Sequence, residues 1–126
     1  KFAKTIKRIN SAGVGVVVVS PTPKSGKNNG DCLIKKYLFD NKIDCNFYPS
    51  ELSHQYEIIK KLSLFSPVYW LHKDICNEGI CFAEMNNVFI YRDAGHLSKE
   101  GSSFLGNKYN WYDKMRTLAL SGLKTK

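Results

Sequence analysis

Asp93 and His96 are the two residues of this sequence whose types and spacing point most clearly to chemistry. They lie in the segment Tyr91-Arg-Asp-Ala-Gly-His-Leu-Ser-Lys-Glu-Gly101, with the aspartate three residues before the histidine. A turn of this length can bring the carboxylate to the imidazole, where it fixes the ring tautomer and stabilises the imidazolium. A histidine supported in this way can act as a general base toward a hydroxyl nucleophile. The pattern specifies only two positions, so a histidine that merely forms a hydrogen bond in a loop is the alternative.

The segments before this pair predict an α/β fold. Apolar residues at positions 2, 6 and 9 have helical spacing, and Ser11-Ala12-Gly13 would end a helix of about ten residues. Residues 14–19 form an apolar, mostly β-branched run, which is typical of a parallel strand buried on both faces. Residues 20–23 would end this strand, and a polar loop over 24–31 would follow at its carboxyl edge. In open α/β sheets, ligands bind at that edge.

The second half of the sequence repeats the alternation of helices and strands. A short helix is expected over residues 33–39, and a longer one from Pro49-Ser50-Glu51, with one apolar stripe at positions 52, 56, 59 and 62. Residues 67–71 are expected to form a second strand, and residues 88–91 an extended run that leads into Asp93. From Leu97 the chain is expected to be helical, with Ser98 as cap, Leu105, Tyr109 and Tyr112 on the buried face, and a frayed tail over 121–126.

Length and charge restrict the class of protein. The sequence has 126 residues and a net charge of +8, so we expect one domain with an affinity for anionic surroundings such as acidic glycans, lipid headgroups or nucleic acid. The basic residues are dispersed and form no arginine-rich run, so no nucleic-acid partner is expected. No segment reaches the ~20 apolar residues that a membrane span requires.

Four cysteines, at positions 32, 45, 76 and 81, allow several interpretations. Sequential pairing, Cys32 with Cys45 and Cys76 with Cys81, would close two short loops and would suit an exported protein. Four reduced thiols in a cytosolic protein are one alternative. A zinc site formed by His72, Cys76 and Cys81 is another, although Cys32 and Cys45 are too far apart to form a second tight knuckle.

The segment 91–101 resembles the last conserved block of the SGNH (GDSL-like) hydrolase superfamily. In that block, Asp-x-x-His is followed by Leu, a small hydroxyl residue and a Gly that opens the final helix. The resemblance extends to the SGNH domains fused to membrane acyltransferases of the acyltransferase three family. Those domains have a similar order of a strand with a Pro-containing loop, a Cys, a helix and a Cys-containing loop. These features correspond here to residues 16–23, Cys32, the helix from Glu51, and Cys76 with Cys81.

The resemblance implies a partial three-layer α/β/α domain of flavodoxin-like type with a parallel sheet. Residues 1–126 would be the C-terminal portion of a single SGNH domain, since the sequence begins within a helix and lacks the family's Gly-Asp-Ser, Gly and Asn blocks. His96 would be the general base and Asp93 its orienting partner. The nucleophile and oxyanion hole would come from the missing N-terminal half, so this chain alone is expected to be inert. No cofactor and no metal are expected.

For the intact parent, the resemblance implies O-acylation, in particular O-acetylation, of a cell-envelope polysaccharide on the extracytoplasmic side of the inner membrane. The partners would be an upstream membrane domain, an acyl donor and the glycan. A secreted carbohydrate esterase and a non-catalytic module that binds an anionic glycan are the alternatives. Because a parallel sheet without its N-terminal strands exposes an edge, the chain is also expected to dimerise there or to remain associated with its missing half.

Overall fold

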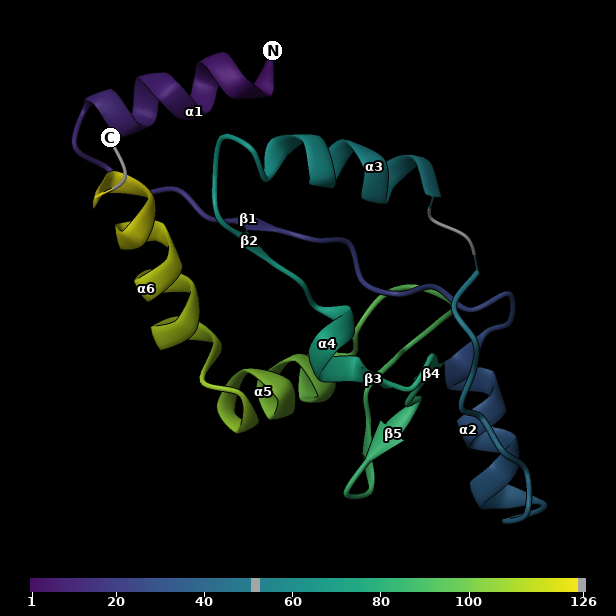
Figure 1. The fold of residues 1–126 in the computed structure, drawn as a ribbon. Coiled ribbons are helices and arrows are strands. Elements are labelled where there is room, and N and C mark those ends of the chain that lie inside the picture. Colours follow the sequence, from purple (N-terminus) through teal and green to yellow (C-terminus); the bar gives the residue numbers. More distant parts are fainter. Residues whose placement is uncertain (51–52, 125–126) are drawn as a thin grey trace. The chain divides into compact units, whose positions relative to one another are not determined.

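The computed structural model describes residues 1–50 and 53–124 (Figure 1). The chain divides into two compact units. The first comprises Lys1–Pro21, Ser53–Trp70 and Asn110–Lys126, and the second comprises Thr22–Leu52 and Leu71–Tyr109. Helices and strands alternate along the chain and two of the strands are parallel, which confirms the predicted α/β class. No helix in the described residues is long and apolar enough to cross a membrane.

The first unit is built on a short parallel sheet. Strands β1 (Val18–Val19) and β2 (Val68–Tyr69) pair in parallel, with Val18 opposite Val68 and Val19 opposite Tyr69. Its helices are α1 (Phe2–Ser11), α3 (Ser53–Leu62) and α6 (Trp111–Lys124). Both strands lie where the sequence predicted them, but the ladder is shorter than the apolar runs 14–19 and 67–71.

Helices α3 and α6 cover opposite faces of this sheet. Neighbouring residues of an extended chain point to opposite sides. The Tyr69 ring meets that of Trp111 at the start of α6, with centroids 6.4 Å apart, and the Trp70 ring stacks on Tyr56 of α3 at 5.9 Å. Helix α6 also approaches the backbone of Gly15, where an added Cβ would lie 2.5 Å from the carbonyl oxygen of Ala119. The first unit therefore has the α/β/α layering that the resemblance implied.

Among its described residues, the second unit has two β-hairpins and three helices. Strands β3 (Cys76–Asn77) and β4 (Ile80–Cys81) form one antiparallel hairpin, and β5 (Glu84–Met85) and β6 (Val88–Phe89) form the other. Their turn residues, 78–79 and 86–87, all have positive φ, as two-residue type I′ turns require. The helices are α2 (Asn29–Leu38), α4 (His72–Ile75) and α5 (Lys99–Lys108). The core includes Leu33, Cys45 and Ala83, with Phe89 packed against them.

Several predicted boundaries were wrong. Helix α2 begins at Asn29 instead of residue 33, because the Asn28 side chain caps it by accepting a hydrogen bond from the Asp31 N–H, 3.1 Å away. The C-terminal helix is two helices, since Asn110 has φ of 51° between α5 and α6. Tyr112 is 79% exposed and not part of a buried face, and the chain is still helical at Lys124. The predicted start of α3 at Glu51 and its apolar residue Leu52 lie outside the described residues.

Both disulfides of the sequential pairing are present, and both belong to the second unit. One joins Cys32 of α2 to Cys45, 13 residues later, and the other joins Cys76 to Cys81 across the first hairpin. The alternatives of reduced thiols and of a zinc site with Cys76 and Cys81 are therefore wrong, because a cystine has no thiolate to offer a metal. The described residues contain no cluster of potential metal ligands.

Removing the Cys32–Cys45 disulfide is expected to destabilise the chain more than removing Cys76–Cys81. Loop-closure entropy predicts a loss of about 3 kcal/mol for the longer loop and about 2 kcal/mol for the shorter one. Cys45 and Cys81 are both buried, so each double variant also loses packing and the difference in loop length sets the ranking. Urea unfolding of C32A/C45A and C76A/C81A measures the difference. A larger loss for C76A/C81A would contradict this ranking.

Candidate active site

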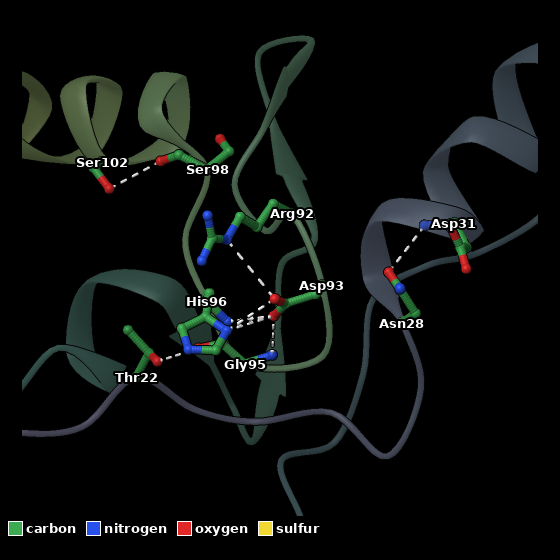
Figure 2. Close-up of polar contacts among 9 residues, drawn as sticks. All are labelled: Thr22, Asn28, Asp31, Arg92, Asp93, Gly95, His96, Ser98 and Ser102. Atoms are coloured by element: carbon green, nitrogen blue, oxygen red, sulfur yellow. Dashed lines mark hydrogen bonds and ion pairs between the residues drawn. The ribbon is translucent and has the colours of Figure 1, made fainter.

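A tight turn over residues 92–96, the Asp-His turn, carries the two predicted catalytic side chains. It is closed by an antiparallel bridge between Tyr91 and Leu97 and by a hydrogen bond from the Arg92 N–H to the His96 carbonyl oxygen, 3.0 Å. Strand β6 leads into the turn, and α5 begins shortly after it (Figures 1 and 2). The turn is thus fixed at both ends by regular structure.

The Asp93 carboxylate contacts the His96 imidazole directly. Its Oδ2 and Oδ1 lie 2.8 and 3.1 Å from Nδ1 of the ring, and Figure 2 shows the two groups side by side. A carboxylate only accepts hydrogen bonds, so Nδ1 carries the proton and Nε2 of the neutral ring is left with its lone pair. The His96 side chain is 71% exposed. The ring is therefore exposed and in contact with its carboxylate, so a buried His96, one of the arrangements that the glycan-binding alternative predicts, is not observed.

Backbone hydrogen bonds keep Asp93 ionised. The N–H groups of Gly95 and His96 both donate to Oδ1, at 2.9 and 2.7 Å. These bonds, with a smaller contribution from the His96 ring, lower the pKa of Asp93 from 3.8 to about 2. Arg92 adds only a distant contact, with its Nε 3.8 Å from Oδ2. The carboxylate is therefore ionised at neutral pH.

The start of α5 supports the turn from the downstream side. Ser98 caps the helix by accepting a hydrogen bond from the Gly101 N–H at 2.8 Å, as the sequence predicted, and its own hydroxyl donates to the carbonyl of Phe89. Gly101 packs against Ile90, where an added Cβ would lie 2.5 Å from the carbonyl oxygen. A glycine is required at this position because any side chain would push α5 away from the strand that enters the turn.

Helix α2 supports the turn from another direction. A Cβ added at Gly30 would lie 2.2 Å from the carbonyl oxygen of Arg92, so the first turn of α2 touches the backbone next to Asp93. Farther along, Lys36 and Tyr37 of α2 both bind the Glu84 carboxylate on β5. Residues 24–31 were predicted to form a loop. Helix α2 in fact begins within this segment, and its first turn supports the candidate site.

Tyr91 is a supporting residue whose role the sequence pattern did not indicate. Its side chain is fully buried, its hydroxyl donates to the Pro23 carbonyl oxygen at 2.7 Å, and its ring meets Phe47 edge to face. This contact joins the entrance of the Asp-His turn to the Pro-containing loop that follows β1. The separation of 68 residues explains why no local pattern could indicate it.

Comparisons with known proteins point to one kind of domain. The family model described as an SGNH domain fused to AT3 domains matches residues 1–110. A solved structure, the periplasmic domain of a lipopolysaccharide acetyltransferase from Salmonella ser. Paratyphi A, superimposes with a TM-score of 0.58 at 26% identity. The match covers 88% of this chain and 47% of the Salmonella chain, so the present chain spans about half the length of that domain. No curated protein matches the sequence.

Proposed function

Because the chain belongs to the family of SGNH domains fused to AT3 domains, we propose that it supplies the base and the orienting carboxylate of a serine O-acyltransferase. His96 is the general base and Asp93 its partner. The observation that carries this proposal is the contact of 2.8 Å between the Asp93 carboxylate and His96 Nδ1, on an exposed ring whose Nε2 is left to accept a proton. The similarity to a lipopolysaccharide acetyltransferase domain supports O-acetylation of a cell-envelope polysaccharide.

The proposed reaction has two halves. In the first, a seryl Oγ attacks the acyl carbonyl of the donor while His96 Nε2 takes the hydroxyl proton, and this proton then leaves with the donor's leaving group. In the second, a sugar hydroxyl attacks the acyl-enzyme, His96 Nε2 takes its proton, and the proton returns to the seryl oxygen as the sugar ester leaves. Asp93 keeps the ring in the required tautomer and stabilises the imidazolium in both halves.

The nucleophile is proposed to lie in a Gly-Asp-Ser block, which the 126 residues do not contain. The oxyanion hole of the intact domain would use the family's Gly and Asn blocks, which are also not recognisable in this sequence. In the described residues, β1 and β2 pair only with each other. We propose the N-terminal half of the same domain as the partner of this sheet, and the chain alone as catalytically inert.

An extracytoplasmic site of action follows from the same proposal. The Salmonella neighbour is a periplasmic domain, and two disulfides suit an oxidising compartment. The membrane partner would be the AT3 domain that the family description names. The net charge of +8 favours approach to an anionic envelope glycan.

Deletion of the gene that encodes this chain tests the proposal. Base-labile acetate on the envelope polysaccharide is expected to fall, to be restored by the wild-type gene, and to stay low with an Asp93→Ala/His96→Ala double variant. An increase in polysaccharide acetate on deletion would instead support the esterase alternative. Full restoration by the double variant would contradict a catalytic role and support the glycan-binding module.

A further inference from the structure

The loop over residues 22–25, the proline loop, holds the Asp-His turn by its backbone carbonyls. The Thr22 hydroxyl donates to the Gly95 carbonyl oxygen at 2.6 Å, and the Ser25 N–H donates to the Ala94 carbonyl oxygen at 2.7 Å (the Thr22 bond is drawn in Figure 2). Both bonds lie within the second unit. The proline loop therefore contacts the turn between Asp93 and His96.

The Thr22 bond acts on a peptide group that also binds the Asp93 carboxylate. The carbonyl of Gly95 and the N–H of His96 belong to one planar peptide unit, so they point in opposite directions and can only move together. The carbonyl end accepts from Thr22 at 2.6 Å, and the N–H end donates to Asp93 Oδ1 at 2.7 Å. The peptide plane is thus fixed at both ends, and the Cα of His96 is attached directly to it.

We propose that Thr22 is a positioning residue of the acyl-transfer site, whose hydroxyl fixes the Gly95–His96 peptide and thereby the alignment of Asp93 with His96. The inference rests on the proposed function for its catalytic consequence. Thr22 does not touch the reacting atoms. It acts through the peptide group: without its hydroxyl the carbonyl end of the plane loses this hydrogen bond, and a tilt of the plane would draw the His96 N–H away from the carboxylate.

The apolar stem of the neighbouring Lys24 side chain cannot replace the Thr22 hydroxyl as a hydrogen-bond donor to the Gly95 carbonyl oxygen. The Lys24 stem lies over Gly95, where an added Cβ would meet its Cγ at 2.9 Å, so the turn is packed against an apolar stem on that side. That stem offers no hydrogen bond to the Gly95 carbonyl. A valine at position 22 would keep the shape of the threonine and remove only the donor, leaving a partly buried carbonyl without this partner.

The test compares Thr22→Val with Thr22→Ser and with a control, Ser50→Ala. The Ser50 hydroxyl donates to the Lys24 carbonyl oxygen at 3.2 Å, so its loss removes a hydroxyl-to-carbonyl bond on the same loop without touching the Gly95–His96 peptide. The first readout is the pKa of Asp93 in the 126-residue chain, from the ¹³C resonance of its carboxyl group. The second is the initial acyl-transfer rate of the full-length gene product.

In Thr22→Val, the pKa of Asp93 is expected to rise from about 2 toward 3.8, because the backbone bonds that lower it are weakened. The acyl-transfer rate is expected to fall about tenfold, since a small misplacement of a catalytic group has large kinetic effects. Thr22→Ser and Ser50→Ala are expected to retain both wild-type values. An unchanged pKa of Asp93 in Thr22→Val, or an equal shift in Ser50→Ala, would overturn the inference. If the wild-type protein transfers no acyl group, the proposed function fails, while the titration still decides whether Thr22 positions Asp93.

Discussion

Replacing His96 by alanine is expected to lower the acyl-transfer rate of the full-length gene product by roughly 10⁴-fold or more, because a serine hydroxyl is a poor nucleophile without a base. The histidine side chain is 71% exposed, so its loss leaves no cavity. The Asp93 carboxylate would keep the hydrogen bonds from the Gly95 and His96 backbone N–H groups. The variant should therefore fold like the wild type and lose only its acyl-transfer activity.

Hydrolysis of 4-nitrophenyl acetate and transfer of acetyl to the glycan both measure this effect. His54→Ala is the matched control, because His54 is an exposed histidine on α3 of the first unit and has no place in the proposed mechanism. It is expected to keep the wild-type rate. A His96→Ala variant within tenfold of the wild-type rate would exclude His96 as the general base.

Replacing Asp93 by asparagine is expected to lower the rate by roughly 10³-fold to 10⁴-fold, the order found when the aspartate of a serine triad is made neutral. The asparagine side chain can still accept the two backbone hydrogen bonds through its oxygen. Its NH₂ group would then face Nδ1 and donate to it, which moves the ring proton to Nε2. Nε2 is the atom that must accept the seryl proton, so the variant would carry the wrong tautomer.

Asp40→Asn is the control for this second effect. The Asp40 carboxylate also accepts a backbone hydrogen bond two residues ahead, from the Lys42 N–H at 3.0 Å, but it lies in a solvent-exposed turn. The control variant is expected to keep the wild-type rate. Equal rates for Asp93→Asn and the wild type would mean that the carboxylate does not set the tautomer.

The stability of Asp93→Asn should also depend on pH in a defined direction. The pKa of Asp93 is lowered from 3.8 to about 2 in the folded chain, so the ionised carboxylate stabilises the fold above pH ~4. This contribution is lost as the pH falls from about 4 through 2. The difference in urea midpoint between wild type and Asp93→Asn is therefore expected to shrink over that range. A difference that is constant from pH 6 to pH 2 would contradict the lowered pKa of Asp93.

The parts of the fold that are locally encoded were predictable from sequence. Helix α1 follows its apolar spacing, the β1 and β2 strands lie within apolar runs, and the Ser98 cap follows from its place before a helix. The approach of Asp93 to His96 was also expected, since a turn of three residues can bring the carboxylate to the ring. The catalytic role assigned to this pair remains a proposal.

Other features depend on contacts that no local pattern contains. The β5–β6 hairpin has strands of only two residues, too short for an alternating pattern, and its turn uses two asparagines with positive φ. The start of α2 has a glycine in its first turn, which is typical of a loop, yet Gly30 is there because the Arg92 backbone leaves no room for a side chain. The bond from Thr22 to Gly95 spans 73 residues. The sequence thus predicted the contact between Asp93 and His96 but not the segments that hold it.

The ring tautomer of His96 shows whether Asp93 aligns the imidazole as a general base. With ¹⁵N-labelled histidine in the 126-residue chain, two-bond and three-bond ¹H–¹⁵N couplings identify which ring nitrogen carries the proton at a pH where the imidazole is neutral. We expect a proton on Nδ1 in the wild type and its transfer to Nε2 in Asp93→Asn. A wild-type ring protonated mainly on Nε2, or a tautomer that is the same in both proteins, would contradict this expectation.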